Sequence, residues 1–508
     1  MHHSSPRSAR RTWPWLFAVL LTGWSCTSAE DPEQTTPSID NAFETIALET
    51  ETRPPAPPRP SNPTTMAATT PPVSRADDPW TRVVWTRDVG AGTDIVSFSN
   101  QLVLMGYDSR DGRGERVLLE QRANYAKPLI TPSGKEVVYT LRAQNAVVAI
   151  QWGKRKRRHI AAGFALAVWR DPATGDEWVY VGRDEEETDP PSYHSIHRYR
   201  LSDPGSGEIV WNAQPVSGDG FQLSADGRYA GGLFPWPRAG VADLTAGTWR
   251  QLGEGCWTAF SGDGNTIFWY FDGAHRNLTL VDVETEQRWQ VNINGAPGID
   301  GFEVWHPRWA NDSRYLVMTG PYTVGRLANK IRGGGTQVEI WLGEFSADFS
   351  SVEQWRQITN NDMPDFYPDA WIEPSTTSRP ADTRVRPGVD AVARRDAAES
   401  RLVMEARVKR AVQVPTPESI MPYKNGLHAL DYEVVRVIEG RYDESTLVVA
   451  HWIIRDGEML DTAQRSAGST HRLTVELYDS HSELEGERLV MSTDAFTLPL
   501  YYDVESLP

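Results

Sequence analysis

Leu223-Ser-Ala-Asp-Gly-Arg-Tyr229 is the stretch that decides the fold, because its pattern recurs three more times along the chain. The pattern is a hydrophobic residue, two small residues, an Asp or Ser, a Gly or Ser, and then a hydrophobic strand. The other copies begin at Ile130, Phe260 and Trp309. A tight turn between two apolar runs is a strong signal for a β-hairpin, and hairpins that recur along a chain indicate a propeller or a solenoid.

The spacing of the copies indicates about six blades, with seven as the alternative. The interval between Ile130 and Leu223 is long enough for two blades, and a degenerate copy from Phe164 to Val181 fills it. No long segment has the 3.6-residue periodicity of an amphipathic helix, so we expect an all-β domain with little helix.

An incomplete last copy predicts how the ring closes. Tyr367-Pro-Asp-Ala-Trp371 has no hairpin after it, whereas the strand-like segments that begin near Trp80 have no inner strand before them. We therefore expect Phe366–Ile372 to add the innermost strand to this first blade. Closure is expected because an open array leaves an unpaired sheet edge.

Three copies, at Leu223–Tyr229, Phe260–Asn265 and Trp309–Leu316, resemble the Trp-Ser-Pro-Asp-Gly-Arg repeat of TolB-type, WD-like β-propellers of exported bacterial proteins and lipoproteins. The resemblance covers roughly residues 80–374 and implies the fold. It implies little about activity, since propellers host both binding proteins and enzymes. Two turns depart from the family pattern, because Ser133 replaces the usual Asp and Ser313 replaces the usual Gly.

A second domain follows, because five later segments alternate apolar and polar residues as half-buried strands do. These segments are Leu402–Lys409, Tyr432–Ile438, Thr446–Trp452, His471–Leu477 and Arg488–Ser492. Five such strands indicate a small closed barrel. Tyr432–Gly440 and the strand after it resemble netrin/TIMP-like OB barrels, although Glu439 replaces the usual Lys. The resemblance implies a domain that binds other proteins and places no contact residue.

The first residues are typical of an export signal. Arginines at 7, 10 and 11 precede an apolar run, Trp13–Thr22, that is too short to cross a bilayer. Two cleavage interpretations remain open: Cys26 becomes lipid-modified, or cleavage after Ala29 releases a soluble protein. The lipoprotein is expected on the periplasmic side of the outer membrane or on the cell surface, and the released form in the periplasm or outside the cell.

Composition divides the chain into five segments. Residues 1–29 are the expected signal peptide, 30–78 a disordered Pro/Thr-rich tether, 79–374 the propeller, 375–397 a linker and 398–508 the OB-like barrel. The tether cannot bury enough apolar surface to fold. It is suited to a lipid-anchored protein, because it holds the folded domain away from the membrane.

Composition also disfavours several functions. The formal net charge of −17 disfavours binding to nucleic acid or to anionic membranes. The sequence has neither a Gly-x-Ser-x-Gly nucleophile motif nor a Gly-rich phosphate loop. With Cys26 and Cys256 as the two cysteines there is no disulfide framework, and we interpret Cys256 as a buried apolar residue. We therefore expect no catalytic residue and no cofactor.

His194 and His197 are weak candidates for a metal site. They follow the acidic stretch Asp184–Asp189, and imidazoles with nearby carboxylates can hold a divalent ion. On a strand, however, an odd offset places the two side chains on opposite faces, so we expect no metal.

Aromatic residues beside a long insertion give the predicted ligand site. Trp305, His306 and Tyr322 lie at strand ends next to the insertion Thr323–Thr336, where aromatic rings can stack on a sugar or hold a peptide. Additional polar contacts are expected from Arg308, Asp365 and Asp369.

The sequence thus favours a non-enzymatic, monomeric binding or scaffold protein of the cell envelope, whose tethered propeller engages a protein or a glycan. The alternative is a glycan-active enzyme, similar to a polysaccharide lyase, with its site in the propeller funnel.

Overall fold

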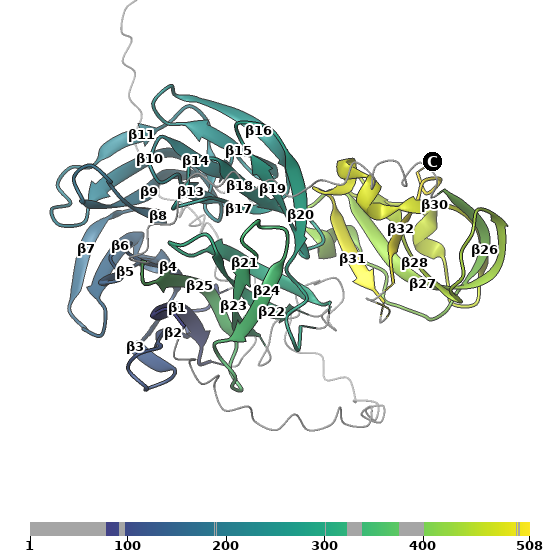
Figure 1. Cartoon of the computed structure of the whole chain (residues 1–508), viewed down its shortest axis with the longest axis horizontal. Coiled ribbons are helices and arrows are strands. Elements are labelled where there is room, and N and C mark those ends of the chain that lie inside the picture. The colour runs from purple at the N-terminus through teal and green to yellow at the C-terminus, as the bar shows by residue number, and fades with distance from the viewer. Residues whose placement is uncertain are drawn as a thin grey trace, which may run out of the picture. The chain divides into compact units, whose positions relative to one another are not determined.

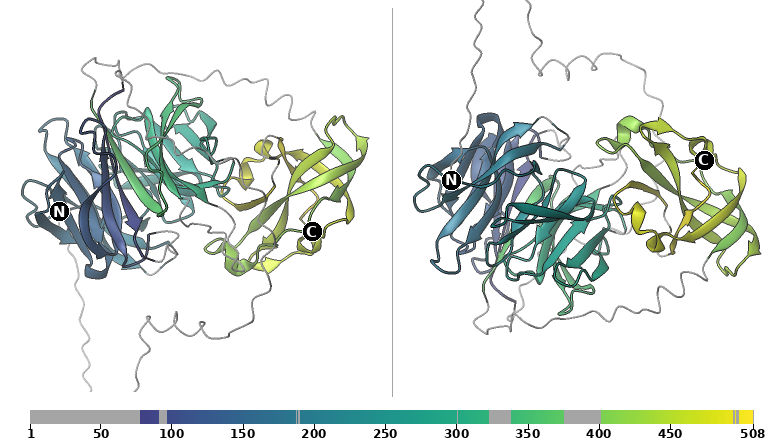
Figure 2. Two further views of the ribbon diagram at one scale, coloured as in Figure 1. Left: turned by 90° about the horizontal axis from the view of Figure 1, so that it is seen from below. Right: turned by 90° about the horizontal axis from the view of Figure 1, so that it is seen from above.

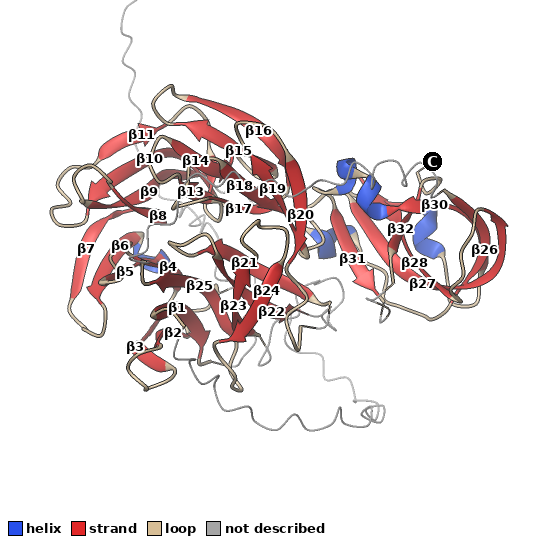
Figure 3. Cartoon of the chain, viewed as in Figure 1, coloured by secondary structure: helices blue, strands red, loops and turns tan. Residues whose placement is uncertain are grey.

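Strands form almost all of the regular structure in the computed structural model, which describes residues 78–90, 97–186, 188, 190–299, 301–322, 338–374, 401–493, 495 and 498–507. Within these residues helix is limited to short 3-10 turns, among them η2 (Arg142–Gln144) and η4 (Pro417–Ile420) (Figure 3). No helix in the described part of the chain is long and apolar enough to cross a membrane.

Six antiparallel sheets are arranged around one axis as the blades of a propeller (Figure 1). From the innermost strand outward, blade 1 contains β25 (Asp365–Ile372), β1 (Thr81–Asp88), β2 (Leu102–Asp108) and β3 (Arg116–Ala123). Blade 2 contains β4 (Tyr125–Ile130), β5 (Glu136–Leu141), β6 (Ala146–Gln151) and β7 (Arg157–Ala162). Blade 3 contains β8 (Phe164–Arg170), β9 (Glu177–Glu186), β10 (Ser192–Arg200) and β11 (Glu208–Trp211), with β12 (Val216–Ser217) also paired to β10.

The other three blades have the same order. Blade 4 contains β13 (Phe221–Leu223), β14 (Tyr229–Leu233), β15 (Arg238–Asp243) and β16 (Thr248–Glu254). Blade 5 contains β17 (Cys256–Phe260), β18 (Ile267–Phe271), β19 (Asn277–Asp282) and β20 (Arg288–Asn292). Blade 6 contains β21 (Glu303–Trp309), β22 (Tyr315–Tyr322), β23 (Glu339–Phe345) and β24 (Val352–Gln357). The prediction of a six-bladed propeller is confirmed.

The repeated turn joins the innermost strand of a blade to its second strand. The copies that begin at Ile130, Leu223, Phe260 and Trp309 all have this position, and the degenerate copy forms β8 and β9 of blade 3. The ring closes as expected, because β25 pairs antiparallel with β1, with Ile372 opposite Thr81. Buried apolar clusters fill the spaces between neighbouring blades, for example Val83 and Trp85 of blade 1 with Val317 and Ile340 of blade 6.

Hydrogen bonds at the turns also connect every blade to the next, forming a turn belt around the ring. Its members are Trp371 Nε1 to Pro132 O (2.9 Å), Ser133 N to Glu177 Oε1 (2.6 Å), Trp169 Nε1 to Ala225 O (3.2 Å), Ala225 N to Gly264 O (2.9 Å), Ser313 N to Asp263 Oδ2 (3.1 Å) and Asn311 Nδ2 to Ile372 O (2.9 Å). Both departures from the family pattern belong to this belt. The Ser133 hydroxyl donates to Glu177 (2.9 Å), and the Ser313 hydroxyl donates to Asp263.

Five strands of the C-terminal domain form a closed barrel (Figure 2). In order around it they are β26 (Leu402–Val408), β27 (Gly426–Glu439), β28 (Thr446–Arg455), β32 (Leu500–Asp503) and β30 (Thr470–Leu477), which pairs back with β26. The third and fifth strands in chain order, β28 and β32, are parallel. This order confirms the OB-like barrel.

One predicted barrel strand has a different place. Arg488–Ser492 forms β31, which pairs parallel with the first half of β27 outside the closed ring. β32 closes the ring instead. Its four residues are too few to show an alternating pattern, and the burial of Tyr501 and Tyr502 holds it in place.

Propeller and barrel belong to one unit, Ala68–Pro508, and contact each other at blades 5 and 6. The Arg488 guanidinium pairs with Glu303 (2.5 Å), and Gly273 N donates to Glu485 O (2.8 Å). Glycine is required at 273, because a Cβ atom there would lie 2.1 Å from Glu487 O.

Candidate functional site

A cavity of about 130 Å³ lies where the innermost strands of the blades begin. This volume is close to that of an engineered cavity of ~150 Å³ that binds benzene. Every blade contributes to the lining, together with residues 419–423 and Arg488 of the barrel domain. Eight of the 22 lining residues carry Phe, Tyr or Trp rings: Phe98, Phe164, Tyr193, Trp236, Trp257, Trp305, Tyr367 and Tyr423.

Four innermost strands carry a β-bulge with a non-glycine residue in the left-handed region. These bulge residues are Lys127 in β4 (φ 44°), Trp257 in β17 (φ 23°), His306 in β21 (φ 51°) and Tyr367 in β25 (φ 50°). Such a conformation costs about 1–3 kcal/mol per residue and persists only where surrounding structure holds it, often at a binding site. Three of the four, all except Lys127, line the cavity.

Contacts among the bulge residues connect separate blades. The His306 ring lies 4.0 Å from the Tyr367 ring and 5.5 Å from the Trp257 ring, between centroids. Tyr367 donates its hydroxyl to Asp219 Oδ1 (2.8 Å), and Lys127 donates from Nζ to Gly218 O (2.6 Å). The segment before β13 is therefore tied to the innermost strands of blades 1 and 2.

Burial favours the uncharged forms of the titratable bulge residues and of Cys256. It lowers the pKa of His306 to about 4, and it raises the pKa of Tyr367 well above its ordinary value. Burial, with a contribution from Arg308, lowers the pKa of Lys127 to about 7. Burial also raises the pKa of the Cys256 thiol to about 11, so this cysteine stays protonated and hydrogen-bonded to Tyr423.

The structure separates the six predicted ligand residues into three groups. Trp305 and His306 line the cavity. Tyr322 is buried behind them and stacks on Trp305, with 5.0 Å between ring centroids. The insertion Thr323–Thr336 lies outside the described residues.

Arg308 and Asp369 form an ion pair beside Lys127 rather than part of the cavity wall. Arg308 Nε donates to Asp369 Oδ1 (2.9 Å), and Asp369 Oδ2 also accepts from Ile130 N (2.6 Å). Both charges act on the pKa of Lys127. The pair therefore connects the innermost strands of blades 6, 1 and 2.

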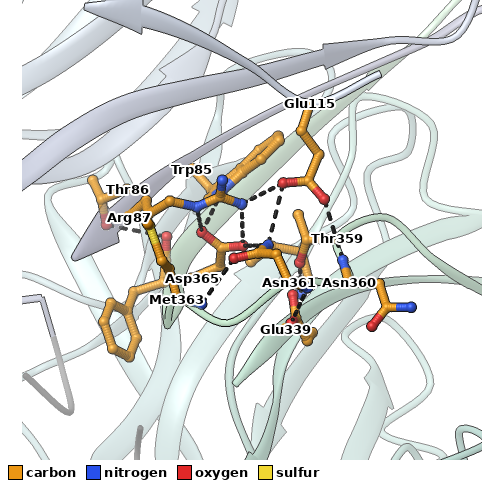
Figure 4. A network of polar contacts seen from close by, with 12 residues as sticks. Trp85, Thr86, Arg87, Glu115, Glu339, Thr359, Asn360, Asn361, Met363 and Asp365 are labelled. Carbon is orange, nitrogen blue, oxygen red and sulfur yellow. Dashed lines mark hydrogen bonds and ion pairs between the residues drawn. The ribbon is translucent and has the colours of Figure 1, made fainter. Parts of the chain in front are cut away.

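Asp365 lies in a separate buried network, which joins the first and last strands of the ring (Figure 4). It accepts from Trp85 Nε1 (2.7 Å) and from Arg87 Nε (2.7 Å), both on β1. Glu115 also pairs with Arg87. Because Asp365 is fully buried and not in the cavity wall, its contacts are those of a residue that fastens β25 to β1.

The two candidate metal histidines have different partners. His194 Nε2 lies 3.4 Å from Glu186 Oε2, whereas His197 Nε2 lies 3.2 Å from Ser195 Oγ. In the described part of the chain, no group of three or more His, Cys, Asp or Glu residues is arranged to hold a metal ion. Cys26, the candidate for lipid modification, lies outside the described residues.

Arg142, Asp219 and Trp257 also line the cavity, and none of them is among the residues predicted from the sequence. Arg142 stands at the end of a hairpin strand and Trp257 within an ordinary apolar strand pattern. The glycines that flank Asp219 were the one local signal that its backbone leaves the strand.

No protein-family model matches the sequence, and no curated protein matches it. Among solved structures, TolB from Acinetobacter baumannii is similar at 16% identity and a TM-score of 0.37, over 57% of this chain and 66% of that one, just under two thirds. A putative TolB from Agrobacterium tumefaciens is similar at 14% identity and a TM-score of 0.30, over 58% of this chain and 99% of that one. A chain of a nidogen/laminin complex is similar at 10% identity and a TM-score of 0.30, over 41% and 91%.

Proposed function

We propose that this protein is a non-enzymatic binding protein of the bacterial cell envelope, and that it holds its ligand in the aromatic cavity of the propeller. The observation that carries the proposal is the convergence of Trp257, His306 and Tyr367 on one cavity from three strained bulges. Three separate strands each hold a strained, left-handed residue at this cavity. A channel with only a structural role does not require such backbone strain.

The state of the groups in the wall suits binding better than catalysis. His306 is neutral, Tyr367 is protonated and engaged with Asp219, and the Cys256 thiol is protonated. A general base or nucleophile needs a pKa near the working pH and access to the substrate. Large aromatic faces in a pocket instead supply contact area for a ligand.

The envelope location rests on the expected export signal and tether in residues 1–78. Mass spectrometry of the mature N-terminus tests it: a diacylglyceryl group on Cys26 is the expected result. An unmodified N-terminus at Glu30 would instead place the protein free in the periplasm or outside the cell.

Ligand capture from a solubilised envelope extract tests the cavity. The wild-type chain is compared with Trp236→Leu, which removes a half-buried ring from the wall, and with Trp152→Leu as a matched control outside the cavity. The retained molecules are identified by mass spectrometry. We expect Trp236→Leu to retain its ligand about tenfold less well, and Trp152→Leu to retain it like wild type.

Hydrogen–deuterium exchange then locates the bound molecule. Slower exchange at Cys256–Phe260 and Glu303–Trp309 on binding supports the cavity. Equal retention by all three proteins, or protection only elsewhere in the chain, would contradict it.

A further inference from the structure

Arg142 differs from the other charged residues of the cavity wall because no carboxylate in the described residues pairs with it. Arg488 of the same wall pairs with Glu303 (2.5 Å), and Asp219 accepts from Tyr367 (2.8 Å). The Arg142 guanidinium instead lies between two rings, with its Cζ atom 4.8 Å from the centroid of Phe98 and 4.9 Å from that of Phe164. Both rings attract the cation without neutralising its charge.

Two N–H groups of the wall are buried without an acceptor in the described structure. They are Nε of Arg142 and Nε1 of the bulge residue Trp257. A buried donor without an acceptor costs about 1–3 kcal/mol, and more when it is charged. The wall thus contains two buried donors that the acceptor oxygens of a ligand satisfy.

The remaining wall defines the rest of the ligand. Apart from the charged and histidine side chains, it consists mainly of aromatic rings with Leu233, Ile420 and Met421, and its volume of about 130 Å³ suits one six-membered ring. A sugar ring would leave buried hydroxyl groups without partners, whereas an apolar ring leaves none.

We infer that the cavity binds a carboxylate on a compact apolar or aromatic group, with the carboxylate on Arg142 and the ring among the aromatic side chains. This inference rests on the proposed function, since it names the ligand class of the same cavity. Arginine suits the role because its fork of N–H donors matches the two oxygens of a carboxylate. A free aromatic acid and the C-terminal residue of a peptide offer this same chemistry.

The test is a ligand titration of the mature chain, in which binding is monitored by intrinsic tryptophan fluorescence. The probes are phenylacetate, its uncharged analogue phenylacetamide, and phenethylamine. We expect phenylacetate to bind at least tenfold more tightly than the other two. Arg142→Gln is expected to lower the affinity for phenylacetate to that for phenylacetamide, and Arg155→Gln, at an exposed ion pair, serves as the matched control.

A second measurement needs no variant. Affinity for phenylacetate is expected to fall as the salt concentration rises, whereas affinity for phenylacetamide is expected to stay constant. A peptide ending in Phe, compared with the same peptide amidated at its C-terminus, separates the two sources: tight binding of the acid peptide alone identifies a chain terminus as the natural ligand.

The outcomes separate the inference from the function on which it rests. Equal affinities for the acid and the amide would overturn the inference even though the cavity binds. Loss of cavity-dependent capture from the envelope extract would overturn the proposed function as well.

Discussion

Glu339 is the carboxylate whose acidity the fold changes most clearly outside the cavity. It is 5% exposed and lies beside Asp365 in the network that joins β1 to β25. Burial, followed by the charge of Asp365, raises the pKa of Glu339 to about 8. The side chain is therefore protonated in the folded protein over a pH range in which it is ionised in the unfolded chain.

Glu339→Gln is expected to make stability less sensitive to pH. Between about pH 4.5 and pH 8 the folded protein binds a proton here that the unfolded chain has released, so stability falls as pH rises, by at most about 1.4 kcal/mol per pH unit. Glutamine does not titrate, so the melting temperature of the variant should rise relative to wild type from pH 5 to pH 8. Glu120→Gln, at an exposed ion pair, is the control, and parallel curves for wild type and Glu339→Gln would contradict the raised pKa.

At the scale of the element, the repeated turn has two tasks. It closes the hairpin within a blade, and through the turn belt it bonds to the neighbouring blade. The two serines that depart from the family pattern donate their hydroxyls to carboxylates of adjacent blades. Ser313 does not have a positive φ, so the glycine of the family pattern is not needed there.

Ser313→Gly is therefore expected to destabilise the propeller although it restores the family residue. The variant loses a buried hydroxyl bonded to Asp263, which contributes about 1 kcal/mol, and gains backbone freedom in the unfolded chain. Ser206→Gly in an exposed turn measures the backbone effect alone. A melting temperature for Ser313→Gly no lower than that of Ser206→Gly would contradict the role of the belt.

For the whole molecule, buried neutral histidines make the fold sensitive to acid. Burial lowers the pKa of His306 in the propeller to about 4 and that of His428 in the barrel to about 3. His451, opposite His428 across β27 and β28, is buried as well and its pKa is lowered well below the ordinary value. The stability that depends on these groups is complete above about pH 6.5 and declines as the pH falls toward 4. The reason is that the histidines of the unfolded chain bind protons in this range, whereas the buried histidines of the folded protein do not.

His451→Leu is expected to reduce this acid sensitivity in the barrel. Leucine cannot be protonated and fills a similar volume at a fully buried position. The melting temperature of the variant, measured by scanning calorimetry, should fall less than that of wild type between pH 7 and pH 5. His194→Leu, at an exposed histidine, should follow wild type, and so should His451→Leu if its imidazole were not held neutral.

Most of the architecture was predictable because its signals are local. The turn copies, the degenerate third blade and the closing strand all show in short runs of residues, and Trp305 and His306 lie in the cavity wall. The other residues of the cavity wall were not predictable, because a bulge such as that at Trp257 depends on neighbouring blades and leaves no mark in an apolar strand. The ion pair of Asp365 was not predictable either, because its partner Arg87 lies 278 residues earlier in the chain.

The pairing of β25 with β1 imposes an order on biogenesis. The chain is synthesised from its N-terminus, so Thr81–Asp88 leaves the ribosome long before its inner partner, Asp365–Ile372, has been made. Throughout that interval the first blade presents a bare backbone edge that accepts any free strand, and a chain that stops before residue 365 keeps that edge permanently. Pairing of the last strand with β1 removes this edge, so a complete chain no longer exposes it whereas a truncated chain does. A quality-control protease or chaperone can distinguish the two forms by that edge.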